Sequence, residues 1–171
     1  MTTLKTLCAI AAGCAMMLPA AAQKQADFGP APAFSNISQW LNGPAQSIEG
    51  LRGKVVLVDF WTYSCINCIR TLPYVKKWHE AYKDKGLVVV GVHTPEYAFE
   101  RKTDNVVEAM KKLGVTYSVA LDNRYATWDA YRNTYWPAVY LIDKKGRIVY
   151  THFGEGKYAE TEATIARLLA E

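Results

Sequence analysis

A continuous apolar run that leads into two closely spaced cysteines constrains this chain most. The run Val55–Trp61 (VVLVDFW) reads as a buried strand, because successive apolar residues suit a strand covered on both faces. Cys65 and Cys68 follow it and stand at the start of a helical pattern. Unpaired N–H groups and the positive dipole end at a helix N-terminus favour the thiolate of the first cysteine. The sequence therefore predicts a reactive thiol pair at a strand-to-helix junction.

Strands and helices alternate along the rest of the chain. Apolar residues at three- and four-residue spacing predict helices over residues 66–82, 104–113, 125–131 and 158–170. Apolar or alternating runs predict strands over residues 34–40, 55–61, 87–92, 117–121, 138–142 and 147–153. Pro73 lies inside the first helix and should kink it by removing a backbone donor. This order predicts an α/β fold with a mixed central sheet flanked by helices on both faces.

The first 22 residues resemble a secretory signal peptide. Lys5 is their only charge, residues 6–18 form an apolar core, and residues 20–22 (AAA) offer a small-residue cleavage site. The apolar core is too short to span a bilayer. We therefore expect export to the periplasm or another space outside the cytoplasm. A lipid anchor at Cys14 is the less favoured alternative.

Removal of this signal simplifies the cysteine count. Cys8 and Cys14 leave with it, so the mature chain keeps only Cys65 and Cys68. A loop this short gains little stability from a disulfide, although exported proteins often use disulfides as structural links. Redox chemistry is the better explanation of the pair. A purely structural disulfide domain used for binding stays open as a rival.

The size and charge of the mature chain fit one small domain. Without residues 1–22, 19 basic residues oppose 16 acidic ones, and the basic residues occur as scattered pairs. Scattered pairs are typical of solvated faces, so no nucleic-acid partner is expected. Residues 23–33, rich in Pro, Gly and Ala, read as a flexible leader. Residues 34–171 then form a single domain, which we expect to be a monomer.

The motifs around the cysteines resemble those of the thioredoxin family. Val58–Trp61 (VDFW) precedes the Cys-x-x-Cys pair, and Pro73 follows Cys68 by five residues, as in thioredoxin. Trp136-Pro137-Ala138, just before a predicted strand, resembles the loop that carries the cis-proline of this fold. A cis bond rests on the resemblance alone, since most X–Pro bonds are trans.

Longer stretches resemble one branch of that family. The leader, the opening strands and the long central insertion look like the exported TlpA/ResA branch. Residues 61–68 (WTYSCINC) and 91–96 (GVHTPE) are similar to the C-terminal thioredoxin-like domain of DipZ-type proteins. The resemblance covers residues 34–171. It implies a thioredoxin-like fold and a thiol–disulfide oxidoreductase acting on protein dithiols and disulfides.

The resemblance also implies roles for individual residues. Cys65 would be the attacking thiolate, and Cys68, one turn into the helix, would resolve the mixed disulfide. Asp59, on the strand beneath the pair, would have a raised pKa and exchange protons with Cys68. The alternative for Asp59 is a carboxylate satisfied by backbone donors. Pro137 would present the backbone of residue 136 to an extended substrate.

Two tryptophans and two departures from the family pattern complete the implied site. Trp61 and Trp136 would form apolar walls around the sulfurs, or else belong to the ordinary core. Many TlpA/ResA-type proteins have Glu three residues after the second cysteine, where this chain has Thr71. Ile66-Asn67 between the cysteines contains no His, which favours a more reducing potential. A reductase in an oxidising space needs a membrane electron donor, and the family implies one of the DsbD/CcdA type.

Other classes of protein share parts of this pattern. A zinc site needs about four ligands, and His79, His93 and His152 lack ligand spacing. His93 and Glu96 read as solvated loop residues. A copper-relay protein of the Sco type stays open, as does a peroxidase, since Thr62 completes a T-x-x-C pattern with Cys65. No cofactor or resident metal is expected.

Overall fold

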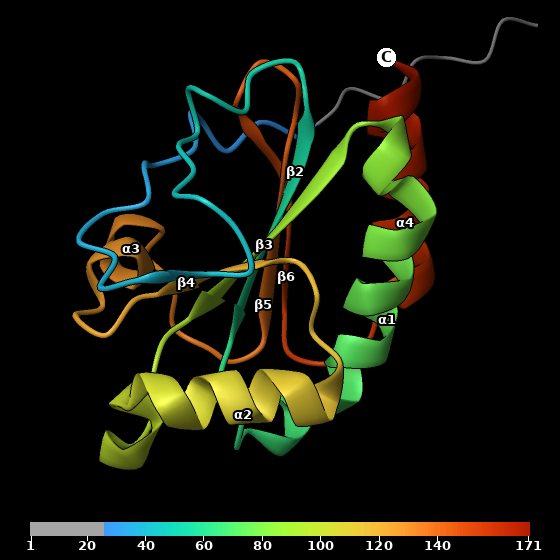
Figure 1. The fold of residues 1–171 in the computed structure, drawn as a ribbon. Helices are drawn as coiled ribbons and strands as arrows, with labels where there is room; N and C mark the ends of the chain where they lie inside the picture. The colour runs from blue at the N-terminus through green and yellow to red at the C-terminus, as the bar shows by residue number, and fades with distance from the viewer. Residues whose placement is uncertain (1–25) are drawn as a thin grey trace, which may run out of the picture.

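A mixed sheet of six strands forms the centre of the protein (Figure 1). The computed structural model describes residues 26–171, so the predicted signal peptide with Cys8 and Cys14 lies outside the described residues. Across the sheet the order is β1 (Trp40–Leu41), β4 (Ser118–Leu121), β3 (Leu87–His93), β2 (Val55–Trp61), β5 (Ala138–Ile142) and β6 (Ile148–Phe153). β2, β3 and β4 are parallel to one another, whereas β1 runs antiparallel to β4, β5 to β2, and β6 to β5.

Helices cover both faces of this sheet unequally, which confirms the predicted α/β architecture. The helices are α1 (Ile66–Tyr82), α2 (Thr103–Leu113), α3 (Ala126–Ala130) and α4 (Tyr158–Ala170), with 3₁₀ turns η1 (Lys83–Lys85) and η2 (Ala98–Arg101). One core cluster contains residues of α1, α2 and α4, and the other contains α3 and the chain before β2. Figure 1 shows α1 beside α4 on one side and α3 on the other. The insertion α2–β4 widens the sheet between β3 and β1.

The position of β2 in the middle of the sheet explains why its sequence is almost wholly apolar. All seven of its residues are buried. Val55, Leu57 and Trp61 pack toward α1, while Val56, Val58 and Phe60 pack toward α3. Because side chains alternate along a strand, Asp59 shares the α1 face with Leu57 and Trp61. The one charged residue of the strand therefore points toward the helix that carries Cys68.

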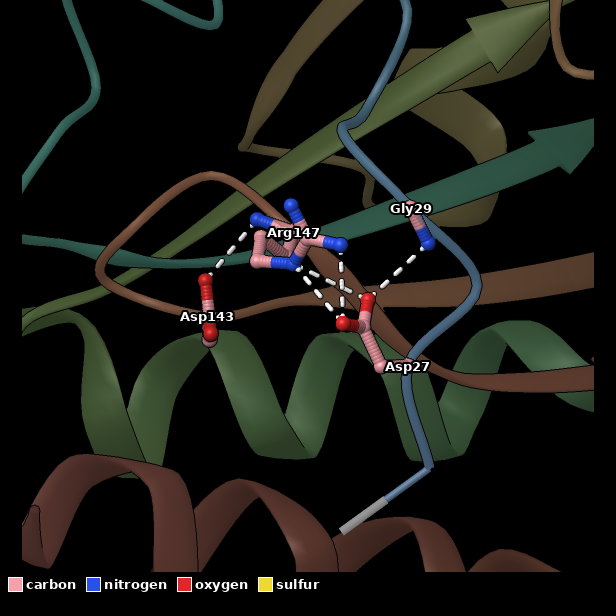
Figure 2. Close-up of polar contacts among 4 residues, drawn as sticks. All are labelled: Asp27, Gly29, Asp143 and Arg147. Atoms are coloured by element: carbon pink, nitrogen blue, oxygen red, sulfur yellow. Dashed lines mark hydrogen bonds and ion pairs between the residues drawn. The ribbon is translucent and has the colours of Figure 1, made fainter.

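The first described residues are attached to the β5–β6 hairpin (Figure 2). The Asp27 carboxylate accepts hydrogen bonds from Nη2 of Arg147 at 2.7 Å and from the N–H of Gly29 at 3.0 Å. The Asp143 carboxylate accepts the backbone N–H of Arg147 at 2.8 Å and so fixes the hairpin turn. Backbone hydrogen bonds between residues 28–31 and the hairpin continue this contact. The described part of the expected leader is therefore held against the domain.

Two local expectations differ from the structure or are refined by it. The predicted opening strand over residues 34–40 is limited to β1, which begins only at Trp40. Phe34 instead packs edge-on against Trp40, with 5.5 Å between ring centroids, so its apolar character serves packing rather than strand pairing. Pro73 does not interrupt α1, which continues from Ile66 to Tyr82.

Gly91, in the middle of β3, is the position at which an added methyl group should disturb the core most directly. An ideal Cβ there would lie 2.9 Å from Nε1 of Trp61 and 3.1 Å from Cε2 of Tyr117. We expect Gly91→Ala to lower the free energy of unfolding by about 1–3 kcal/mol, because packed rings must move to admit it. Urea denaturation followed by circular dichroism measures this loss.

Gly43→Ala is the matched control for this substitution. Its Cβ would meet only the side chain of Ser118, whose hydroxyl oxygen lies 2.8 Å away and can rotate. The control should therefore lose clearly less stability. Equal losses in the two variants would contradict the close packing described for Gly91.

Candidate active site

Cys65 occupies the N-cap position of α1, where its sulfur takes the role usually played by a side-chain oxygen. Its backbone is extended, with φ −72° and ψ 115°, and its Sγ accepts the N–H of Cys68 at 3.3 Å. The side chain is half-buried, so it remains partly open to solvent. Both cysteines are free thiols in this structure, which therefore describes the reduced pair. The geometry directs an unpaired helix N–H at the first sulfur.

The two sulfurs have opposite acidities. Hydrogen bonds from the Cys68 thiol and from the N–H groups of Cys68 and Asn67 lower the pKa of Cys65 to about 6, against the opposing effect of partial burial. The hydrogen bond from the Cys68 thiol to Cys65, together with burial, raises the pKa of Cys68 far above its ordinary value. Cys68 is only 1% exposed. At neutral pH the pair is therefore one accessible thiolate with one buried thiol behind it.

Asp59 lies beneath this pair as a buried carboxyl group. It is 1% exposed, and neither carboxylate oxygen has a hydrogen-bond partner among the described residues. Burial raises the pKa of Asp59 to about 7, and the negative charge of Cys65 adds to the effect. The alternative that backbone donors satisfy this carboxylate is therefore wrong. The structure brings Cys65, Cys68 and Asp59 together, as the sequence predicted.

The loop before β5 carries the proline that the sequence singled out. The Trp136–Pro137 peptide bond is cis. Nε1 of Trp136 donates to the carbonyl of Thr94 at 3.0 Å, and the Thr94 N–H donates to the carbonyl of Trp61 at 3.1 Å. The indole of Trp136 also packs on Trp128, with 4.2 Å between ring centroids. These contacts fix the cis-proline loop to the end of β2, directly before the cysteine pair.

The two predicted aromatic walls differ in exposure. Trp136 is half-buried at the rim of the core, whereas Trp61 is 0% exposed and packs in the cluster that contains Cys68. We therefore expect Trp61 to support the site from behind, while the loop of Trp136 faces a substrate. Ile66, between the cysteines, is 56% exposed and adds an apolar side chain next to Cys65.

Glu100, which the sequence analysis did not single out, clamps the segment before Cys65. It is 0% exposed, and its carboxylate accepts hydrogen bonds from the hydroxyl and N–H of Ser64 at 2.6 and 3.3 Å. It also accepts the N–H groups of Glu96 and Tyr97 at 2.6 and 3.0 Å. Burial opposes ionisation, but these hydrogen bonds prevail and hold the pKa of Glu100 below its ordinary value. The available signal was weak: Glu100 stands at the third position of η2, as in a capping box, but Tyr97 replaces the usual Ser or Thr at the cap.

His93 was expected in a solvated loop, and that expectation is wrong. It is the last residue of β3 and is 0% exposed. Its ring stacks on Tyr63 with 5.7 Å between centroids, and its Nε2 lies 3.3 Å from Oγ1 of Thr62. Burial lowers the pKa of His93 to about 4, so the ring is neutral at pH 7. Glu96, in contrast, is exposed.

These contacts bear on the rival classes. Thr62 is 0% exposed with its hydroxyl next to His93, so it does not lie open beside Cys65 for a peroxide. Within residues 26–171, no three His, Cys, Asp or Glu side chains gather in a group that could hold a metal ion. In the same range, no helix combines the length and apolar character required to cross a membrane.

The fold and site define a class of protein: thioredoxin-like domains with a Cys-x-x-Cys pair at a helix start and a cis-proline before the neighbouring strand. Residues 28–169 match the model of the Redoxin family, and the chain belongs to that family. Within it, the relatives identify the TlpA/ResA type of thioredoxin-like thiol–disulfide oxidoreductases. The predicted family is thereby confirmed.

Three similar proteins illustrate this relationship. Protein DipZ of Mycobacterium tuberculosis (strain CDC 1551 / Oshkosh) is 55% identical over 144 residues, which cover 82% of this chain and 21% of DipZ. The thiol-disulfide oxidoreductase YkuV of Bacillus subtilis (strain 168) is 30% identical over 83% of this chain and 95% of YkuV. A solved thioredoxin-like superfamily protein superposes with a TM-score of 0.77 at 26% identity, covering 83% of this chain and 97% of that one. The chain thus spans about a fifth of the length of DipZ.

Removal of the Glu100 charge should loosen the segment before Cys65. We expect Glu100→Gln to lower the free energy of unfolding at pH 7 by about 1–3 kcal/mol, because buried donors lose a charged acceptor. An acid whose pKa is lower in the folded protein than in the unfolded chain stabilises the fold at pH values above its unfolded-chain pKa, about 4.3 for Glu. This stabilisation is lost as the pH falls through the pKa of the folded protein. The stability difference between wild type and variant should therefore shrink below pH 4, as measured by urea denaturation across pH.

Glu96→Gln is the control for this experiment, since the Glu96 side chain is exposed. Its stability should stay within about 0.5 kcal/mol of wild type. A Glu100→Gln variant as stable as the Glu96→Gln control at pH 7 would contradict a stabilising role for the hydrogen bonds that Glu100 accepts.

Proposed function

We propose that this protein is an exported thiol–disulfide oxidoreductase that exchanges disulfides with proteins through Cys65 and Cys68, more readily as a reductase. The observation that carries the proposal is the asymmetry of the pair. Cys65 is a partly exposed sulfur with a pKa of about 6, and Cys68 is a buried thiol one helical turn behind it. An accessible thiolate with a protected thiol next to it can capture a partner and then release it.

The first step is attack by Cys65. Its thiolate forms a bond to one sulfur of a substrate disulfide, the substrate S–S bond breaks, and the departing substrate thiolate takes a proton from solvent. The product is a mixed disulfide between Cys65 and the substrate. The cis-proline loop supports this step, because the backbone of Trp136 can pair with an extended substrate segment.

The second step needs the buried acid. The ionised carboxylate of Asp59 accepts the proton of Cys68, and the resulting thiolate attacks Cys65. The mixed disulfide breaks, the second substrate thiolate leaves, and Cys65 and Cys68 are left as a disulfide. Two electrons have then passed to the substrate. A pKa of about 7 suits Asp59 to this transfer, because a proton acceptor works best near the operating pH.

The direction of electron flow and the compartment rest on further features. Ile66-Asn67 between the cysteines contains no His to stabilise the thiolate further, which supports a reducing potential. The signal-like residues 1–22 support export to the periplasm. A reductase there must be recharged, and a membrane dithiol donor of the DsbD/CcdA type fits that requirement. Similarity to YkuV, which is named a thiol-disulfide oxidoreductase, supports the redox role.

Replacement of the resolving cysteine should trap partners. We expect Cys68→Ser to accumulate mixed disulfides through Cys65, because the second step lacks its nucleophile, and to lose insulin reduction almost completely. Non-reducing gels, before and after dithiothreitol, measure the adducts. Cys65→Ser is the control and should form none. Adducts that persist in Cys65→Ser, or their absence from Cys68→Ser, would refute the assigned roles.

Replacement of the buried acid should slow release of the mixed disulfide. At pH 7 we expect Asp59→Asn to release a preformed adduct about tenfold more slowly or worse, because Cys68 loses its proton acceptor. The deficit should shrink at high pH, where hydroxide removes the same proton. Stopped-flow fluorescence across pH measures the release rate, and equal rates at pH 7 would remove Asp59 from the mechanism.

The same variant has an internal control for folding. A carboxyl group whose folded-state pKa is raised to about 7 disfavours the folded state as the pH rises through that value. Asp59→Asn should therefore be more stable than wild type at pH 8. A slow but more stable variant separates a chemical defect from a folding defect.

A further inference from the structure

Three buried polar groups lie together on the α1 face of the sheet, beneath Cys68. They are the Asp59 carboxylate, the hydroxyl of Tyr117 and Nε1 of Trp61, and none of these atoms has a hydrogen-bond partner among the described residues. Native proteins satisfy the large majority of buried polar atoms. A cluster of unsatisfied ones beside a redox pair therefore indicates a shared role rather than three separate defects.

The strand register sets the distance between these groups. Asp59 on β2 lies directly opposite Gly91 on β3, so both residues face α1 about one strand spacing, roughly 4.8 Å, apart. A Cβ on Gly91 would lie 3.1 Å from Cε2 of Tyr117 and 2.9 Å from Nε1 of Trp61. The hydroxyl-bearing edge of the Tyr117 ring therefore covers the bare backbone of Gly91, next to Asp59.

The charges around Tyr117 agree with this placement. Tyr117 is 2% exposed, and burial together with the nearby charges of Asp59 and Cys68 raises its pKa well above the ordinary value. Its hydroxyl therefore stays protonated and can donate at every pH at which the enzyme works. The other titratable group on this ring is His79 of α1, at 5.7 Å between ring centroids, and burial lowers its pKa so that it is neutral at pH 7.

We propose that Tyr117 is a positioning residue for the resolving step, with its hydroxyl stabilising the ionised carboxylate of Asp59. The proposal rests on the proposed function and adds a group that sets when Asp59 can accept the Cys68 proton. Tyr117, Asp59 and Trp61 together offer the two to four polar partners that one buried water needs, and a bridging water is the contact that this proposal requires. The hydroxyl keeps its own proton; the proton that moves is the one that passes from Cys68 to Asp59.

A second buried tyrosine provides a matched control. The hydroxyl of Tyr131 also lacks a partner among residues 26–171, and burial raises its pKa well above the ordinary value, as it does for Tyr117. Tyr131 lies on the opposite, α3 face, where its ring contacts Phe60 and Tyr140. Removal of its hydroxyl changes a buried tyrosine in the same way without touching the Asp59 side of the sheet.

The test compares Tyr117→Phe with Tyr131→Phe in the reduced protein. The Asp59 carboxyl carbon is titrated by NMR, and the release rate of a preformed mixed disulfide is followed across pH. Loss of a donor to the charged form should raise the pKa of Asp59 by about one unit in Tyr117→Phe and shift the pH midpoint of release upward by the same amount. At pH 6 this is about tenfold slower release. Tyr131→Phe should shift neither midpoint.

A double substitution separates this role from simple packing. In an Asp59→Asn background, Tyr117→Phe should slow release no further, because its effect passes through Asp59. Additive losses, or an unchanged Asp59 titration in Tyr117→Phe, would overturn the proposal. Failure of the proposed function would look different: wild-type protein would then form no mixed disulfide, while the Asp59 titration would still report on Tyr117.

Discussion

The hydrogen bond from the N–H of Cys68 to the sulfur of Cys65 is the contact on which the site depends. It exists because β2 ends at Trp61 and α1 begins at Ile66, which leaves Cys65 at the cap with helix donors directed at it. A helix start is where backbone donors lack partners, so a sulfur placed there is held as its anion. The buried strand anchors one side of this junction and the amphipathic helix the other. Acidity of one thiol is therefore a consequence of chain topology.

Two buried carboxylates near that junction behave in opposite ways. Glu100 accepts four hydrogen bonds and stays ionised, whereas Asp59 accepts none from the described residues and has a pKa of about 7. Burial opposes the charge of both, so the number of donors decides the outcome. An acid with many donors holds a loop in place. An acid without them can take up and release a proton near neutral pH, which suits Asp59 to the proton transfer that we propose for Cys68.

The sequence was sufficient to predict the elements and to place Cys65, Cys68 and Asp59 close together, because both follow from local patterns. The apolar run of β2, the helical spacing after Cys65 and the position of Asp59 are all readable along the chain. It was insufficient for Glu100 and His93, because their contacts depend on how the end of β3 and the segment after it lie against residues 62–64. A histidine after an apolar run looks like a loop residue until its stacking on Tyr63 is known. Contacts between segments far apart in the sequence leave no periodic pattern of residues from which they could be predicted.

The two segments that border Cys65 are both hydrogen-bonded to the chain around the end of β2. The Thr94 N–H binds the end of β2 and its carbonyl binds the indole of Trp136, so the cis-proline loop is tied to the strand that leads into Cys65. Glu100 ties the segment after Thr94 to Ser64, on the other side of the same junction. The cis-proline loop and the segment after Thr94 are therefore both held by the adjacent ends of β2 and β3, two parallel strands in the middle of the sheet. In the proposed function, a substrate segment that reaches Cys65 meets surfaces that rigid strands hold in position, which would orient it toward the sulfur before any bond forms.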